Sequence, residues 1–382
     1  MNWRQTWAEA PSTALLILGT LAQQQGHQVK ILHLDIEPVS ISHIIDTFKP
    51  DIVGITVNTF QVKSARQIVK EIRETEKSIR IIIGGPHAIV WKDDADQVVV
   101  GEGENAWLEL IGATSRIKSI DDIPMVDYRL VNLKQFCGIS SVGLSPSMCM
   151  MASRGCPFSC IFCNTPVLWG KKVRFRSPQL VLDEIEYLHK TYGAKEIFLQ
   201  DDTFNLNLAW AMEILEGIIR RKLHKEMVFR LCSRANSRLI TKEYLDLAYR
   251  AGVWNIFFGI ESGSQKMLDL MRKTLTVAEI KATAQMVHAA KISMECSFIV
   301  GLPGETLETL RETDKLINEI KPSRYGWCHA CPFPFTAFDK EVTEKGHKRD
   351  IDYAEYAYGK QMVRTDELDY AILESFKGFT YA

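Results

Sequence analysis

The first third of the chain alternates short apolar runs with stretches of helical spacing. Apolar runs rich in Val and Ile and bounded by Gly, Pro or Asp are typical of buried parallel strands. Apolar residues at i, i+3 and i+4 are typical of amphipathic helices. The pattern predicts strands over 29–34, 52–57, 81–83 and 98–100, and helices over 14–22, 41–48, 63–74 and 105–111.

This alternation predicts a doubly wound, Rossmann-like α/β domain over residues 1–112, in which ligands bind at the carboxyl ends of the strands. Two such ends are rich in glycine, Gly84-Gly85-Pro86-His87 and Gly101-Glu102-Gly103-Glu104. Glycine lets the backbone approach a ligand closely. Residues 1–11 are polar, so the opening strand that such a sheet usually has is missing before the first helix.

A second α/β unit is expected after an irregular linker, 113–146. Apolar runs again alternate with helical stretches over 147–340, which predicts a partial (β/α)6 barrel. The C-terminal segment, 341–382, is expected to be helical, with an amphipathic helix over 365–377 that packs on the barrel or covers its mouth. The predicted barrel strands are 148–152, 196–200, 228–233, 255–259, 295–300 and 325–330.

Charge and composition narrow the function classes. The net charge is −1, from 46 basic and 47 acidic residues, which gives no support to a nucleic-acid partner. No apolar run has the length of a membrane span. The apolar stretch 14–22 loosely resembles a signal peptide, but we interpret it as an amphipathic helix capped by Ser12 or Thr13. Nine cysteines in a chain of 382 residues do not make a disulfide scaffold.

Three cysteines are clustered in Cys156-Pro-Phe-Ser-Cys160-Ile-Phe-Cys163, a C-x3-C-x2-C pattern. Three thiolates on one short loop can ligate three irons of a [4Fe–4S] cluster, and the fourth iron is then open to another ligand. A zinc site usually needs four protein ligands, often from C-x2-C pairs, and no second pair is nearby. We therefore favour a cluster over zinc or unrelated structural cysteines, and a reducing, cytoplasmic location.

The stretch from Met151 to Cys163 closely resembles the cluster loop of radical S-adenosylmethionine (SAM) enzymes, including the aromatic Phe162 before the last cysteine. The resemblance implies that the open iron binds the amino and carboxylate groups of SAM. One electron from the cluster then cleaves SAM to a 5′-deoxyadenosyl radical, which abstracts hydrogen from an unactivated carbon.

Further segments resemble this family in the family's order, and each implies a SAM contact. Adjacent strand residues point to opposite faces, so one of Asp201 and Asp202 is expected to bind SAM and the other to cap the next helix. An ordinary surface role for Arg234 stays open. The resemblance implies that Asp201 or Asp202 binds the methionyl ammonium, Arg234 the carboxylate, Glu261 and Ser262 the ribose, and Leu302 the adenine.

Residues 1–112 resemble the cobalamin-binding domain that is fused to a large radical SAM subclass, through Gly26-His27, 51–56, 84–87 and 100–104. This resemblance implies a corrin over the carboxyl edge of the sheet, facing the SAM site. The D-x-H-x-x-G motif that supplies a histidine to cobalt is absent, so we interpret His87 as part of a tight turn. The implied cobalamin contacts are Thr56, Val57, Asn58, Gly84, Gly85, Pro86, His87, Gly101, Glu102, Gly103 and Glu104.

The late segment Cys328-His-Ala-Cys331 has C-x2-C spacing. Side chains at this spacing on a strand point to opposite faces, so we interpret them as buried strand cysteines rather than as an auxiliary or substrate site.

These features favour a cobalamin-dependent radical SAM methyltransferase that acts on a small-molecule or lipid-like substrate and takes electrons from a flavodoxin or ferredoxin. One alternative is a radical SAM cyclase, oxidase or rearrangement enzyme in which cobalamin has another role or is lost. A second alternative is a non-enzymatic protein that senses cobalamin or SAM.

Overall fold

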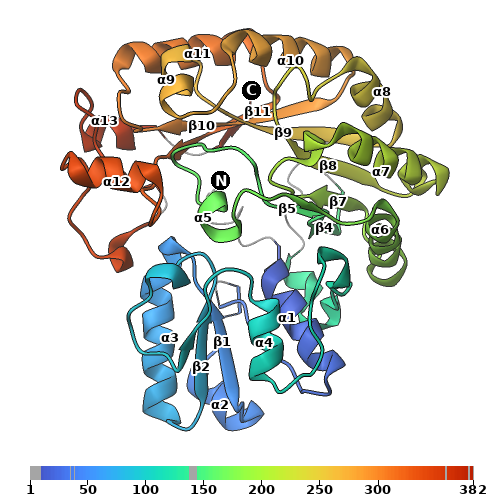
Figure 1. Ribbon diagram of the computed structural model, residues 1–382, viewed down its shortest axis with the longest axis vertical. Coiled ribbons are helices and arrows are strands. Elements are labelled where there is room, and N and C mark those ends of the chain that lie inside the picture. Colours follow the sequence, from blue (N-terminus) through green and yellow to red (C-terminus); the bar gives the residue numbers. More distant parts are fainter. Residues whose placement is uncertain are drawn as a thin grey trace.

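The computed structural model describes residues 10–34, 36–37, 39–136, 144–357, 359–376 and 379–381. Two α/β units face each other, with the small N-terminal sheet at the bottom of Figure 1 and the larger curved sheet at the top. The short helix α5 (Thr165–Trp169) lies between them. None of the described helices has the length and apolar character that a membrane span requires.

The N-terminal sheet is parallel, with strand order β1-β2-β3. Its core lies between the sheet and helix α3, where Val69 and Ile72 of the helix join Ile81 and Ile83 of the sheet. The alternation of strands and helices agrees with the predicted doubly wound pattern. The elements are α1 (Thr13–Gln24), α2 (Ile41–Phe48), β1 (Ile52–Thr56), α3 (Val62–Thr75), β2 (Arg80–Gly84), β3 (Gln97–Val98) and α4 (Glu104–Leu110).

The strand predicted over residues 29–34 is not formed, and this prediction was wrong. A strand needs a hydrogen-bonded neighbour, and β1 pairs only with β2 in the described sheet. Helix α4 packs on one face of β1, where its Trp107 ring lies 3.5 Å from the position that a Cβ on Gly54 would take. The Trp107 indole donates to the carbonyl of Leu18 in α1 (3.0 Å), which holds the two helices together.

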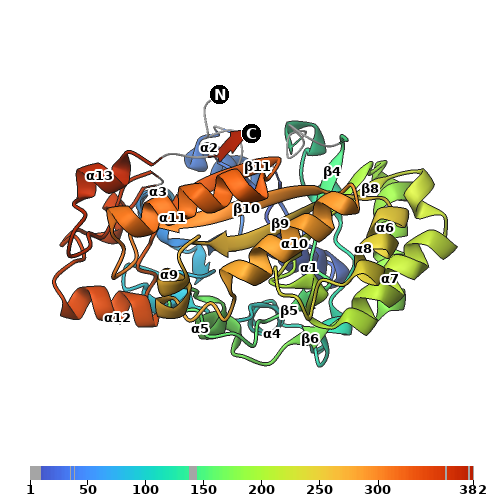
Figure 2. The same cartoon turned by 90° about the horizontal axis from the view of Figure 1, so that it is seen from above.

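The larger sheet has the strand order β12-β11-β10-β9-β8-β7-β4, and all its pairs except β11 with β12 are parallel. All six predicted barrel strands are present, within a few residues of their predicted ends. Figure 2 shows α10 and α11 along the outer face of this sheet. The strands are β4 (Ser147–Met150), β7 (Glu196–Leu199), β8 (Val228–Ser233), β9 (Val253–Glu261), β10 (Ser293–Val300), β11 (Arg324–His329) and β12 (Phe379–Tyr381). The helices are α6 (Pro178–Tyr192), α7 (Leu208–Arg220), α8 (Lys242–Arg250), α9 (Gln265–Leu270), α10 (Val277–Ala289) and α11 (Leu307–Ile320).

The C-terminal segment is less helical than predicted. Within its described residues the α-helices are α12 (Ala337–Glu344) and α13 (Tyr370–Glu374), so the helix expected over 365–377 is found only over a short central part; Lys377 lies outside the described residues. The Thr365 hydroxyl donates to the carbonyl of Glu305 and accepts from the amide of Leu368, which fixes a turn before the helix. Asp369 then caps α13.

The largest hydrophobic core crosses the linker. Leu16 of α1 and Leu108 of α4 belong to the same buried cluster as Tyr128 of the linker and the barrel strands. The Tyr128 hydroxyl donates to the carbonyl of Cys149 in β4 (3.1 Å). The linker residues therefore pack between the two units as part of the core, and part of the N-terminal unit shares the core of the barrel.

Candidate functional site

The three clustered cysteines lie on the loop between β5 (Ser153–Arg154) and α5, at the carboxyl end of the barrel. The Ile161 amide donates to the carbonyl of Met271 (3.0 Å), which ties the loop to the end of α9. The Cys163 amide donates to the carbonyl of Cys160, and the Thr165 amide donates to Cys163 Sγ (3.4 Å). These hydrogen bonds fix the turn from Cys160 to Thr165, and all three thiols lie on this one short loop.

Burial raises the pKa of both Cys156 and Cys163. Metal ligation requires thiolates, so the positive charge of bound iron would have to offset this cost. Among the described residues, no group of three His, Cys, Asp or Glu side chains is arranged to hold a single metal ion.

Asp201 and Asp202 follow β7 and have different surroundings. Asp201 is 2% exposed, and its Oδ1 accepts a 2.5 Å hydrogen bond from the Ser153 hydroxyl of β5. Burial raises the pKa of Asp201 to about 6, and its Oδ2 is buried without a hydrogen-bond partner. Asp202 is exposed, and it accepts from the amide of Gly155 (3.2 Å) and the hydroxyl of Thr165 (3.1 Å).

The expectation that one of these two aspartates caps the next helix was wrong. The short helix that follows begins at Phe204 after Thr203, and α7 is capped by Asn207. The aspartates instead contact both flanks of the cysteine loop, and Asp202 is the one that lies beside the cysteines.

Arg234 lies against the cysteine loop, and not on the open surface. Its guanidinium stacks 3.7 Å from the ring centroid of Phe158, and its Nη2 donates to the Thr274 hydroxyl (2.9 Å). Burial lowers the pKa of Arg234, while the neighbouring Cys160 sulfur acts in the opposite direction. The Arg234 Nε is buried without a hydrogen-bond partner.

Glu261 ends β9 inside the barrel mouth and is engaged by a residue that the sequence analysis missed. Lys273 Nζ donates to Glu261 Oε1 at 2.8 Å, and both side chains are less than a tenth exposed. A Cβ at Gly259 would lie 2.4 Å from Glu261 Oε1, so glycine is needed under this ion pair. Lys273 Nζ also lies 5.9 Å from the ring centroid of Phe162 in the cysteine loop. The polar triplet at 272–274 was the only sequence signal for this lysine.

Ser262 and Leu302 are both buried in packing contacts. The Ser262 hydroxyl pairs with Thr313 of α11 (3.2 Å) and accepts from the amide of Ser264, so it is directed toward α11. Leu302 is 1% exposed and belongs to the hydrophobic cluster that contains Ile161 of the cysteine loop. An adenine contact at Leu302 and a ribose contact at Ser262 stay predictions.

The strand ends of the N-terminal sheet differ in how open they are. A Cβ at Gly84 would have nothing within 4 Å, whereas a Cβ at Gly85 would lie 2.7 Å from Thr56 Oγ1 and 2.8 Å from the Val57 nitrogen. Gly85 also has a φ of +90°. Gly84 therefore faces free space at the end of β2, and Gly85 is required by the backbone of its own domain. Asn58 caps the turn that follows β1.

His87 is 2% exposed and lies under the C-terminal segment. Its ring makes an edge contact with Tyr353 (centroids 4.7 Å apart), and its Nδ1 pairs with the Thr59 hydroxyl (3.3 Å). Burial lowers the pKa of His87 to about 4. Both ring contacts hold it within protein, as expected for a turn residue. Its neighbour Pro86 is exposed.

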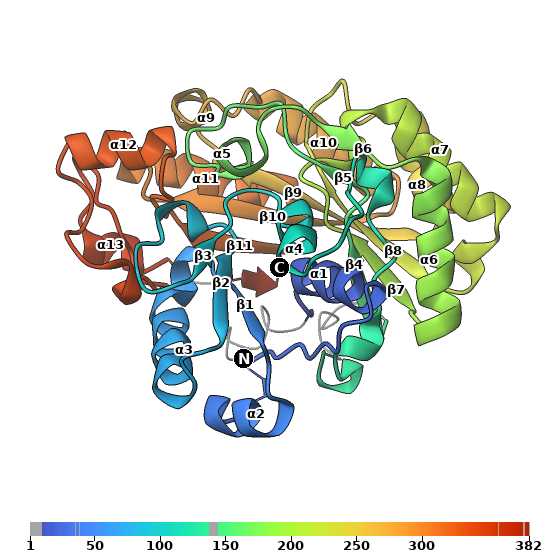
Figure 3. The same ribbon diagram turned by 60° about the horizontal axis from the view of Figure 1, so that its bottom comes forward.

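Glu102 and Glu104 are directed toward the barrel. Glu102 pairs with Arg174 of β6 (Arg174–Phe175), and this hydrogen bond lowers the pKa of Glu102. Glu104 pairs with Arg154 of β5 at 2.6 Å. Figure 3 shows the β5–β6 hairpin and α5 on the side of the barrel that faces α4. Sequence reasoning placed these carboxylates near a corrin, and the structure engages them in ion pairs between the two units. Gly101 and Gly103 complete this loop.

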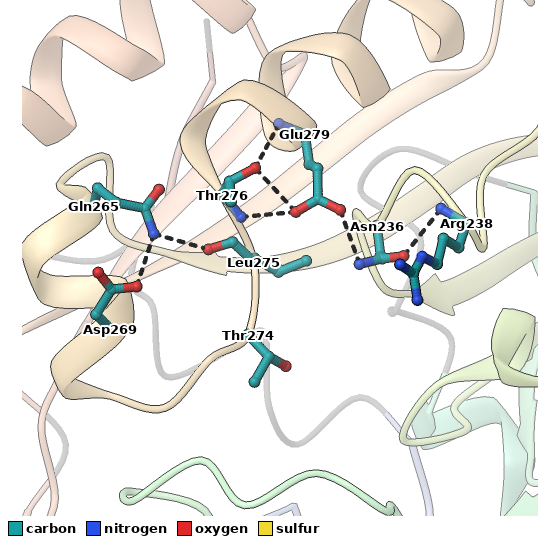
Figure 4. A pocket seen from close by; sticks show the side chains of 8 residues that line it. All are labelled: Asn236, Arg238, Gln265, Asp269, Thr274, Leu275, Thr276 and Glu279. Atoms are coloured by element: carbon teal, nitrogen blue, oxygen red, sulfur yellow. Dashed lines mark hydrogen bonds between the residues drawn. The ribbon is translucent and has the colours of Figure 1, made fainter.

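A pocket of about 360 Å³ lies beside Thr274, between α9 and α10. Figure 4 shows that its polar side chains bind one another: Glu279 accepts from Thr276 and Asn236, and the Gln265 amide group donates to Asp269 and to the carbonyl of Leu275. The hollow is therefore a capping arrangement at the start of α10.

Cys331 is buried and Cys328 is half-buried, and burial raises the pKa of each thiol to about 12. Cys328 is on β11, but Cys331 lies beyond the end of that strand, so the two are not partners on one strand.

Comparison with known proteins assigns families to both halves. Residues 150–317 match the radical SAM superfamily, and residues 8–111 match the B12 binding domain. An uncharacterized methyltransferase of Pyrococcus horikoshii is 29% identical over 85% of this chain and 77% of its own length. An anaerobic magnesium-protoporphyrin IX monomethyl ester cyclase of Cereibacter sphaeroides is 28% identical, and the chain spans only 60% of that protein.

The fold agrees with these matches. The radical SAM methyltransferase TsrM of Kitasatospora setae, solved with cobalamin and a [4Fe–4S] cluster, superposes with a TM-score of 0.73 and 20% identity over 89% of this chain and 76% of its own. The two families bring a [4Fe–4S] cluster, SAM and cobalamin as cofactors. The chain belongs to the radical SAM superfamily, among the members that carry a B12-binding domain ahead of the radical SAM domain, which confirms the resemblance found in its sequence.

Proposed function

We propose that this protein cleaves SAM reductively and methylates an unactivated carbon of a small molecule with the help of cobalamin. The observation that carries the proposal is the placement of the cysteine loop. It lies at the carboxyl end of the barrel and is tied through Arg154 and Arg174 to the loop after β3, at the edge of the B12-binding sheet. The proposed cluster site and the proposed cobalamin site would therefore lie next to each other, where these ion pairs join the two units.

The residues around the cysteine loop suit a cluster with SAM at its open iron. Cys156, Cys160 and Cys163 would hold three irons, and the cluster would supply the electron that cleaves SAM. Asp202 and Arg234 carry opposite charges on either side of the loop, which suits an ammonium and a carboxylate. The unpartnered Nε of Arg234 leaves a donor for such a ligand.

The end of β2 suits a bulky flat ligand. The open space at Gly84 is what close approach of a ligand to backbone requires. Cobalamin, when bound, supplies a carrier for the methyl group. The backbone of 84–87 and 101–104 would line its site with Thr56, while His87 is held by Thr59 and Tyr353.

The Lys273–Glu261 pair would orient the ribose of SAM. Lys273 fixes one oxygen of the Glu261 carboxylate, and the other lies 3.4 Å from the Ser297 hydroxyl. A carboxylate held in this way presents a fixed acceptor to a sugar hydroxyl, because it has little freedom left to lose on binding.

We further propose a cytoplasmic location and a protein reductant such as flavodoxin or ferredoxin. The described cysteines are free, as in a reducing compartment. Lys171 and Lys172 are exposed beside the cysteine loop, and Lys171 Nζ donates to Ser159 within it (2.8 Å). Exposed cations near the cluster would favour the approach of an acidic electron carrier.

The test is a set of product measurements on anaerobically reconstituted protein. About four irons per chain are expected, with 5′-deoxyadenosine formed from SAM under reducing conditions. S-adenosylhomocysteine formation with added reduced cobalamin would support methylation. Production of 5′-deoxyadenosine without S-adenosylhomocysteine would instead favour cyclisation, the chemistry of the Cereibacter relative. Absence of both products would favour a binding protein.

A further inference from the structure

Two arginines and two glutamates join the B12-binding unit to the cysteine loop. Arg154 Nη2 lies 2.6 Å from Glu104 Oε1, and Arg154 Nη1 lies 3.7 Å from Glu102 Oε1. Arg174 holds Glu102 through both of its terminal nitrogens. Arg154 and Arg174 are paired across strands β5 and β6, so two adjacent cations of this hairpin bind the loop at 101–104.

The Arg154–Glu104 pair is buried, unlike most ion pairs of this protein. Arg154 is 6% exposed and Glu104 is 7% exposed. The Arg154 guanidinium also stacks 5.0 Å from the ring centroid of Trp169 in α5. Burying two charges is costly in free energy, so a buried pair brings little or no net gain in stability. A planar guanidinium that is both stacked and paired has little freedom to rotate.

The backbone transmits this geometry directly to the cluster ligands. Arg154 is followed by Gly155 and Cys156, the first cysteine of the loop. Gly155 has a φ of +100°, and a Cβ there would lie 2.6 Å from the carbonyl oxygen of Lys172. Its amide donates to Asp202. Because Gly155 is held on both sides, a displacement of Arg154 would be passed on to Cys156.

We propose that Arg154 and Glu104 are positioning residues that set the separation between the cobalamin edge of the N-terminal sheet and the cluster loop. This inference rests on the proposed function, since it concerns methyl transfer between SAM and cobalamin. The two side chains bind each other and not a reacting group, so they act by fixing the distance between the two sites. Loss of about 1 Å of register can slow a transfer roughly a hundredfold.

The experiment compares Glu104→Gln with Glu109→Gln in the full-length protein. Both glutamates are on α4, but Glu109 forms an exposed pair with Arg116 (3.3 Å) of the linker, and not with the barrel. Iron content, bound cobalamin and SAM affinity are measured first. The rates of S-adenosylhomocysteine formation with reduced cobalamin and of 5′-deoxyadenosine formation are then measured in parallel. Hydrogen exchange is followed at 101–104 and 153–156 in the cofactor-free protein.

Glu104→Gln is expected to keep both cofactors and to lower the ratio of S-adenosylhomocysteine to 5′-deoxyadenosine formation by about tenfold or more. Exchange at both loops should become faster. Glu109→Gln should leave the ratio and the exchange unchanged. Arg154→Lys keeps the charge but loses the planar contact with Trp169, so it should lower the ratio as well.

An unchanged ratio in Glu104→Gln, with cofactors bound, would overturn the positioning role. Equal losses in both products would also overturn it, since they would indicate a merely structural contribution. If the wild-type protein forms no S-adenosylhomocysteine, the proposed methylation fails instead. In that case hydrogen exchange still tests the positioning role: unchanged exchange at 101–104 and 153–156 in Glu104→Gln would overturn it.

Discussion

The buried carboxyl of Asp201 should make the stability of the protein depend on pH. Burial raises its pKa to about 6, from an ordinary value of 3.8. A difference of this size corresponds to roughly 3 kcal/mol between the protonated and ionised forms. Because the pKa in the folded state is the higher one, the contribution of Asp201 to stability is fully present below the unfolded pKa and is lost as pH rises through about 6.

Asp201→Asn removes the ionisation while keeping an oxygen that can accept from Ser153. We therefore expect the variant to gain stability relative to wild type between about pH 3, below the unfolded pKa, and about pH 8, above the folded pKa, by up to roughly 3 kcal/mol. The value is a ceiling, because the Ser153 hydroxyl binds a carboxylate more strongly than an amide. Denaturant unfolding of the cofactor-free protein at the two pH values measures the difference. A stability difference between the two proteins that does not change with pH would refute the assignment of a buried, ionising Asp201.

Four further outcomes are expected, three at the cofactor sites and one in the stability of the N-terminal domain. Asp202→Asn should weaken SAM binding about ten- to a hundredfold at unchanged iron content, through loss of a charge-assisted contact, and a wild-type affinity in a SAM titration would contradict this. Cys160→Ala should abolish SAM cleavage and the absorbance of the cluster, and normal 5′-deoxyadenosine formation would disprove the ligand assignment. Gly84→Leu should fold normally but fail to retain cobalamin on gel filtration, because its side chain would enter the free space at the end of β2. Gly85→Leu should destabilise the domain itself, because its Cβ would meet the backbone of Val57 and φ is positive.

The sequence was sufficient for the order of elements because each carries a local signal. The buried strand β2 contains an apolar run of three isoleucines, and α3 has a clear apolar stripe. The strand at 29–34 was mispredicted because strand formation depends on a partner elsewhere in the chain, which no local pattern reveals. The helix at 365–377 failed for a similar reason, since Thr365 is drawn into contact with Glu305, 60 residues earlier.

The candidate site was predicted where one contiguous motif defines it, as in the cysteine loop. The partners of the predicted residues could not be predicted, because they come together only in space. Lys273 reaches Glu261 from a loop after α9, and Arg154 reaches Glu104 across the two units. A glutamate in a glycine-rich loop gives no sign of whether it faces a ligand or an arginine.

The contact of the C-terminal segment with the N-terminal unit has a consequence for the order of folding during synthesis. Arg66 of α3 binds Asp352, 286 residues later in the chain, and Tyr353 covers His87. When residues 52–90 leave the ribosome, the residues that cover this face have not yet been translated. Folding units generally form from the N-terminus as they emerge, so this surface would stay open until the barrel is nearly complete. The segment around Tyr353 would then dock last, and its docking would require that both units had already folded.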